Sequence, residues 1–168
     1  VQLGHEVQVI AGSLESGAFR SEHEGVQVTR VLDPGPYRGA ITGLSDGGQP
    51  WASNRLQTAA GAHRALAEVL ERTDLDIVEY PDCGGDGILV STLQRVPTAV
   101  RFHSPAKLIM GTYGAEPDDI EVTSFLEQVA IDRADVRISP SAFLAAEVTE
   151  HLGVPAPVHV IRNGIDLD

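Results

Sequence analysis

The chain has 168 residues, a length that suits one domain, and 42% of them are hydrophobic, which is enough for one sizeable core. The 24 acidic residues outnumber the 12 basic ones, and the net charge of −12 argues against a nucleic-acid surface, because such a surface needs a basic footprint. The sequence holds neither an apolar run near the roughly 20 residues that span a bilayer nor a basic, apolar leader, so we expect a cytoplasmic protein.

Strand-like stretches rich in Val and Ile alternate with helix-like stretches rich in Ala, Glu, Leu and Arg. This alternation predicts an α/β fold, Rossmann-like, with a mainly parallel sheet flanked by helices. Strands are predicted at residues 6–11, 26–32, 76–80, 98–102, 135–139 and 158–161. Helices are predicted from Ser53 or Asn54, as the cap, to about Thr73, and at 87–94, 116–134 and 141–152.

Two segments near the N-terminus carry more specific expectations. Residues 26–32 alternate apolar with polar positions, so this strand is expected near a sheet edge. Residues 35–52 are rich in Gly, Pro and Ser and predict a long loop, which in a compact domain is functional or mobile. The loop contains Trp51, the only tryptophan, and Arg38, which is more often a solvated charge than a phosphate ligand.

Two turns follow the strands at 76–80 and 98–102, and parallel strands bring their carboxyl ends to one edge of a sheet, where ligands bind. The first turn, Pro81–Gly87, offers glycines for close backbone approach and the carboxylates of Asp82 and Asp86 for hydroxyl groups. A plain turn with Asp86 capping the next helix explains it equally well. Its spacing fits neither a dinucleotide fingerprint nor a phosphate-binding P-loop.

The second turn is His103-Ser104-Pro105. A histidine at the end of a strand can donate to a sugar hydroxyl or to a developing charge, but the residues alone favour a histidine bonded within its own loop. Lys107 and Glu127 are, on the same grounds, more often charges on solvated surfaces. Cys83 is the only cysteine and the six histidines are scattered, so no metal site is predicted.

Several segments, in order, resemble the N-terminal domain of the GT-B glycosyltransferases, in particular the retaining family 4 group. They are Gly4-His5-Glu6-Val7, the strand and glycine turn from Asp76 to Gly87, His103-Ser104-Pro105, Glu127 with Ala134-Asp135 before Ser139, and Ile161-Arg162-Asn163-Gly164-Ile165-Asp166. Each is weak alone. The closing Asn-Gly-Ile-Asp is the most specific, since in that family it marks the passage to the second domain.

The chain departs from the family pattern at both ends. The family begins with a strand, a glycine turn and a helix before the Gly-His-Glu-Val segment, and that first strand lies centrally, between the strands at Val7 and Asp76. Without it, a sheet is expected to show unpaired edges and a gap in its core. The second domain, with the glutamates that surround the donor, is missing too, so residues 1–168 are expected to form a single acceptor-side domain.

The resemblance implies transfer of a hexose-like sugar from a nucleotide diphosphate donor to an acceptor hydroxyl, with retention of configuration and without a bound metal or other cofactor. It implies a catalytic role for His103, with substrate binding and an interdomain hinge assigned as follows: Asp82, Gly84, Gly85, Asp86, Ser104 and Lys107 for substrates, and Asn163, Gly164 and Asp166 for the hinge. The implied partners are the nucleotide-sugar, an acceptor that is a glycan, a lipid or a small molecule, and the C-terminal domain of the same enzyme. No nucleic acid is expected, and peripheral membrane contact only in the full-length protein. A non-catalytic Rossmann-like or flavodoxin-like binding module is the alternative, and a degenerate, structural relative of the family is a third possibility.

Overall fold

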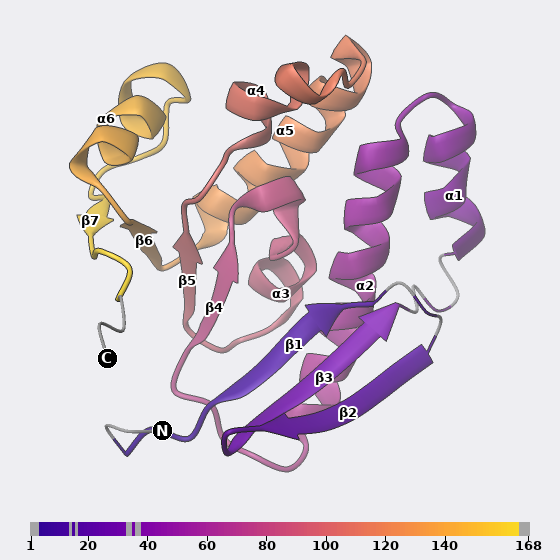
Figure 1. Ribbon diagram of the computed structural model, residues 1–168, viewed down its shortest axis with the longest axis vertical. Coiled ribbons are helices and arrows are strands. Elements are labelled where there is room, and N and C mark those ends of the chain that lie inside the picture. The colour runs from indigo at the N-terminus through magenta and orange to yellow at the C-terminus, as the bar shows by residue number, and fades with distance from the viewer. Residues whose placement is uncertain (1–3, 14, 16, 33–34, 36–37, 165–168) are drawn as a thin grey trace.

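The computed structural model describes residues 4–13, 15, 17–32, 35 and 38–164 (Figure 1). The strands are β1 (Gln8–Gly12), β2 (Gly17–His23), β3 (Val26–Leu32), β4 (Val78–Pro81), β5 (Thr98–Arg101), β6 (Val136–Ser139) and β7 (His159–Val160). The helices are α1 (Arg38–Asp46), α2 (Pro50–Leu70), α3 (Ile88–Leu93), α4 (Ala106–Ile109), α5 (Pro117–Arg133) and α6 (Ala142–His151). Two short 3₁₀ turns complete the order, η2 (Cys83–Gly85) and η3 (Met110–Tyr113).

The strands form two sheets rather than one. The first has the order β1-β3-β2, and the second is an all-parallel sheet of order β4-β5-β6-β7. In the described part of the chain β1 pairs only with β3, and β4 only with β5, so each has one unpaired edge. The sequence predicted a missing strand between these two, and the break in the sheet falls there. The α/β, mainly parallel class is confirmed.

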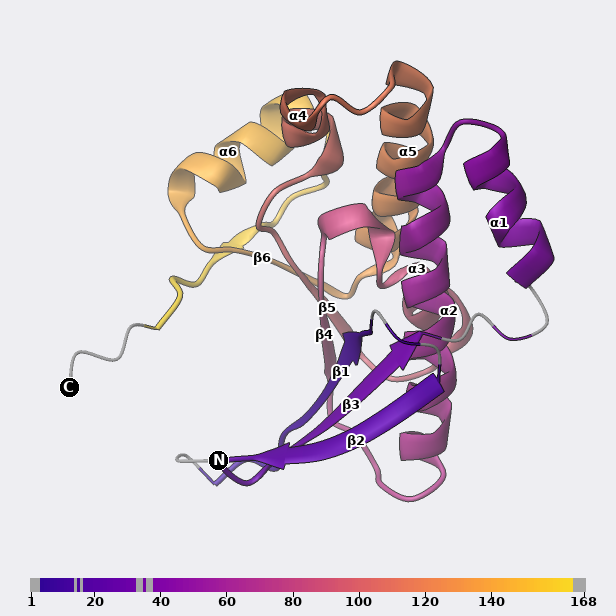
Figure 2. The same ribbon diagram turned by 45° about the vertical axis from the view of Figure 1, so that its right-hand side comes forward.

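One face of both sheets carries the helices (Figures 1 and 2). Tyr80 in β4 points to this face, since its hydroxyl donates to the carbonyl of Ala130 in α5 at 2.9 Å. Alternation along β4 then directs Glu79 to the opposite face, and Ile77, just before the strand, is 53% exposed. Val9 of β1 is 40% exposed. The opposite face is therefore partly apolar and open to solvent.

Strand β3 is the middle strand of its sheet, so its predicted edge position is wrong. The cause is β2, a strand that was not predicted from the sequence. It pairs with β3 in the antiparallel sense, with Gly17 opposite Leu32 at one end and His23 opposite Val26 at the other. All but one residue of β2 are exposed, so it carries no buried stripe that a pattern search detects.

The predicted loop at 35–52 is wrong as well, because α1 occupies Arg38–Asp46 and α2 begins at Pro50. Proline at the first turn favours a helix start, since its missing N–H has no partner there in any case. Neither Ser53 nor Asn54 caps α2. Other predicted ends are confirmed: Pro117 opens α5, and Ser141 Oγ accepts the N–H of Leu144 at 3.1 Å to cap α6.

The main core lies between the parallel sheet and helices α5 and α6. Val100 and Phe102, in and just after β5, are completely buried, and Val148 of α6 is too. Ala130 of α5 is 1% exposed and joins the same cluster. This packing fixes the carboxyl ends of β4 and β5, where the two candidate turns begin.

Candidate glycosyl-transfer site

The turns after β4 and β5 lie side by side, as the sequence predicted. The ladder between the strands continues beyond them, because the N–H of Asp82 donates to the carbonyl of Arg101 at 3.1 Å. The N–H of His103 then donates to Oδ1 of Asp82 at 3.0 Å. The two turns thus share one rim at the carboxyl edge of the parallel sheet. We call residues 81–87 and 103–106 the double rim.

The Asp82 side chain is fully buried within the double rim, with no exposed surface. Burial raises the pKa of its carboxyl, against hydrogen bonds from backbone groups that lower it. Oδ2 has no hydrogen-bond partner among the described residues. In this arrangement Asp82 cannot meet an acceptor hydroxyl directly, and it holds the His103 turn in place instead.

Glu127, on α5, forms hydrogen bonds to both turns. Its Oε1 accepts the N–H of Gly84 at 2.7 Å, and its two oxygens accept the N–H of Ala106 at 3.0 and 2.8 Å. The residue is 3% exposed, so its interpretation as a solvated charge is wrong. Burial raises the pKa of Glu127 to about 7, although these hydrogen bonds lower it. One carboxylate therefore fixes both halves of the double rim to α5.

The glycines of the first turn allow it to pack closely against neighbouring helices, and they do not face an open binding space. Gly85 has a φ of +74°, and a Cβ there would lie 2.7 Å from the backbone of Leu126 in α5. Gly84 has a φ of +72°, and a Cβ would collide with the side chain of Arg55 in α2. Positive φ strains any other residue type. These glycines let the turn sit between α2 and α5.

Asp86 does not cap α3, because Gly87 occupies the cap position and no side-chain cap bond is formed. Its carboxylate instead lies 3.9 Å from the guanidinium of Arg55, with 20% of the side chain exposed. Burial raises the pKa of Asp86 to about 6, and the Arg55 charge opposes this shift. Cys83 is half-buried, and burial raises the pKa of its thiol. The pair Arg55–Asp86 thus adds charge of both signs beside the first turn, and the sequence analysis did not single out Arg55.

The remaining predicted site residues differ in access. His103 and Lys107 are exposed, and Ser104 is half-buried. Lys107 lies on α4, one residue beyond the rim. Of the predicted hinge residues, Asn163 and Gly164 are exposed after β7, and Asp166 lies outside the described residues. His103 is therefore an exposed polar side chain of the double rim.

A shallow cavity of about 30 Å³ opens beside the double rim. Its wall combines Cys83 and Ser104 from the rim with Trp51 of α2 and Tyr113 of η3. The start of α2 is held here by Asp119, whose Oδ2 and Oδ1 accept the N–H groups of Trp51 and Ala52, each at 2.9 Å. Trp51 comes from the segment that was predicted to be a loop, and it contributes to the wall of this cavity.

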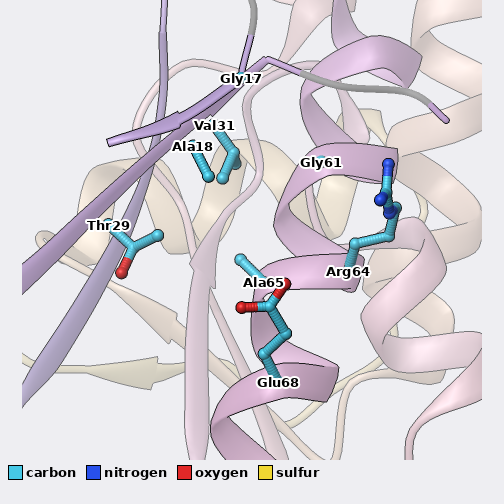
Figure 3. Close-up of a pocket in the computed structure, with 8 residues that line it drawn as sticks. All are labelled: Gly17, Ala18, Thr29, Val31, Gly61, Arg64, Ala65 and Glu68. Atoms are coloured by element: carbon cyan, nitrogen blue, oxygen red, sulfur yellow. The ribbon is translucent and has the colours of Figure 1, made fainter. Parts of the chain in front are cut away.

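A second cavity, of about 50 Å³, lies elsewhere, between β2, β3 and α2 (Figure 3). Small residues of α2, Gly61 and Ala65, line it, and the Glu68 carboxylate forms an ion pair with Arg20 at 2.8 Å. Figure 3 shows Glu68 turned toward the strands and Arg64 turned away. None of the residues of the double rim contributes to this cavity. We interpret it as a packing gap between the first sheet and α2.

Within the described ranges, no three His, Cys, Asp or Glu side chains gather closely enough to hold a metal ion. In the same ranges, no helix combines the length and the apolar character that crossing a membrane requires.

The rim, the parallel sheet and the ordered motifs all point toward one family. Among curated proteins, none matches the chain closely enough to count as a relative. The sequence model of the family Glycosyltransferase Family 4 matches residues 1–168, the whole sequence. The match supports the assignment of an N-terminal GT-B domain with a Rossmann-like fold. The chain belongs to Glycosyltransferase Family 4.

Proposed function

We propose that this domain is the acceptor-side half of a retaining glycosyltransferase, which moves a hexose-like sugar from a nucleotide diphosphate donor to an acceptor hydroxyl. The single observation that carries the proposal is the double rim, where the N–H of His103 is bonded to the buried Asp82 carboxylate. Ligands of open α/β sheets bind at such carboxyl ends. The double rim is therefore the part of the domain that a donor-binding domain would cover.

His103 has the catalytic role in this proposal. Its exposed imidazole would donate a hydrogen bond to the donor sugar near the reacting carbon and stabilise charge as the glycosidic bond to the nucleotide breaks. Asp82 and Glu127 do not contact the substrate in this proposal. They position His103 by accepting hydrogen bonds from the backbone of the two turns. Catalysis by positioning and electrostatics needs such rigid support, since small displacements are costly.

Ser104 and Lys107 remain proposed substrate contacts, and the Arg55–Asp86 pair adds a further polar edge. Lys107 is exposed one residue past the rim, where an ammonium can meet a phosphate oxygen of the donor. Gly84 and Gly85 shape the turn, and Asn163 and Gly164 are proposed to lead into the interdomain hinge.

A nucleotide-sugar screen on the complete protein tests this function. UDP-, GDP- and ADP-sugars are added singly, and both the melting temperature and the release of nucleoside diphosphate are followed. We expect one donor to raise the melting temperature and to be consumed when an acceptor is present. Stabilisation by a nucleotide-sugar without turnover, over a broad acceptor panel, would favour a binding module instead. We also expect residues 1–168 alone to transfer little or no sugar, because the donor site is assigned largely to the other domain.

A further inference from the structure

Two aromatic side chains stack at the mouth of the cavity beside the double rim. The ring centroids of Trp51 and Tyr113 are 6.4 Å apart, and their planes differ by 30°. Trp51 is 37% exposed and Tyr113 is 68% exposed, so both rings present free surface. Two aromatic rings that lie together and stay exposed form a continuous apolar surface on which a ligand ring can stack.

Both rings stand on backbone that the surrounding structure fixes. The Trp51 N–H is bonded to the fully buried carboxylate of Asp119 at 2.9 Å. Tyr113 closes η3 immediately before Gly114, which has a φ of +73° and whose N–H donates to the carbonyl of Gly111 at 3.2 Å. The stacked pair is therefore pre-organised, and a ligand would not have to pay for ordering the backbone that carries it.

The cavity connects the stacked pair to the double rim. Ser104 and Gly84 belong to its wall together with both aromatic residues, and Ile109 and Met110 make the rest of the wall largely apolar. At about 30 Å³ the cavity holds no more than a water-sized group. A larger ligand must therefore lie across the exposed faces of Trp51 and Tyr113, with one edge reaching toward Ser104.

A six-membered ring with an apolar face and a hydroxyl edge fits these constraints. Aromatic side chains stack on such faces, and the few polar groups of the adjoining rim can orient the hydroxyl edge. We propose that Trp51 and Tyr113 form the acceptor subsite, and that the acceptor places such a ring, a pyranose or an arene, on them. This inference depends on the proposed function, because it is that function which makes the ligand an acceptor.

Saturation-transfer NMR on the complete protein tests this subsite without a donor. The probe is phenyl β-D-glucopyranoside, and methyl β-D-glucopyranoside and phenol separate the pyranose from the arene. In wild-type protein we expect saturation of the ring protons of at least one probe. In Tyr113→Ala we expect the affinity to fall about three- to tenfold, in line with the energy of one aromatic contact.

Tyr113→Phe, which keeps the ring, should bind as wild type does. Phe143→Ala is the matched control, since Phe143 is a similarly exposed aromatic residue, at 74%, on α6 and outside the cavity wall. Trp51→Ala should weaken binding as well; if that variant unfolds, the surface substitution Tyr113→Ala decides alone. Absence of saturation for all three probes, or wild-type affinity in Tyr113→Ala, would overturn the subsite.

The subsite and the proposed function can fail separately. Sugar transfer with an unchanged acceptor KM in Tyr113→Ala would remove the subsite and leave the function standing. Ring binding that depends on Tyr113, in a protein that transfers no sugar from any donor tested, would remove the function and leave a ring-binding site.

Discussion

Asp82 Oδ1 accepts the backbone N–H of His103 at 3.0 Å, and this bond ties the turn after β4 to the end of β5. The two residues are 21 positions apart in the sequence, and parallel pairing of β4 with β5 brings them together. The bond explains how an exposed histidine can hold a fixed position: its backbone is anchored to a carboxylate that solvent does not reach.

Asp82→Ala should therefore weaken catalysis, although the Asp82 side chain does not contact the substrate. The N–H of His103 loses its acceptor, and an unsatisfied group of this kind costs about 1–3 kcal/mol of stability. We expect kcat to fall while the donor KM changes little, because the substitution affects placement of His103. Asp82→Asn keeps Oδ1 as an acceptor and should retain most of the kcat. Equal kcat values for the Ala and Asn variants would argue against a positioning role.

The buried Glu127 carboxyl should make the stability of the domain depend on pH. Its pKa is about 7 in the folded state against 4.5 for the free side chain, so between these values the folded state binds more protons than the unfolded one. The stabilisation is fully present below pH 4.5 and is lost as the pH rises through about 7. Asp86, with a pKa of about 6, acts in the same direction.

Urea unfolding of the wild type at pH 5 and pH 8 measures this dependence. Between these two pH values, Glu127 is expected to contribute roughly 2 kcal/mol of the difference. Glu127→Gln has no proton to lose and should reduce the difference in unfolding free energy between the two pH values. An unchanged difference in that variant would show that Glu127 is not the responsible group.

Asp119 should stabilise the start of α2, whereas the adjacent Asp118 should not. Asp119→Ala removes both acceptors of the Trp51 and Ala52 N–H groups, and loss of a helix cap costs about 0.5–2 kcal/mol. Asp118→Ala is the control, because Asp118 is exposed in the same turn of α5. Denaturant midpoints of the two variants should differ clearly, and coincident midpoints would count against the cap.

Gly85→Ala should destabilise the domain by about 2 kcal/mol or more, because the new Cβ would meet the backbone of Leu126 at a positive φ. Gly111→Ala is a suitable control, since a Cβ at Gly111 would have no neighbouring atom within 4 Å. Thermal melts compare the pair. A Gly85→Ala protein as stable as Gly111→Ala would mean that the turn has room to shift.

Much of the fold could be predicted from the sequence because local signals and the final structure agree. The apolar runs before Pro81, His103 and Pro140 place three parallel strands to within two residues, since each run is bounded by a turn former. The signals at Pro117, the first residue of α5, and at Ser141, the cap of α6, are similarly local. The break between β1 and β4 was predicted from the family's strand order rather than from composition.

What sequence reasoning missed depends on contacts across space. β2 is exposed nearly throughout, and α1 has no buried residue, so neither shows a buried stripe. Glu127 resembles a surface charge until the N–H groups of two distant turns are placed against it. The stacking of Trp51 on Tyr113 joins two segments that lie far apart in the sequence, and no local signal in either segment brings them together.

The most direct test of a transfer site at the double rim is the kcat of His103→Ala in the complete enzyme, measured with the donor that the nucleotide-sugar screen identifies. Loss of one hydrogen bond that stabilises developing charge should lower kcat by on the order of a hundredfold or more, with the melting temperature preserved. His23→Ala, an exposed histidine at the end of β2, serves as the control and should keep wild-type activity. Wild-type kcat in His103→Ala would contradict a catalytic role for the double rim.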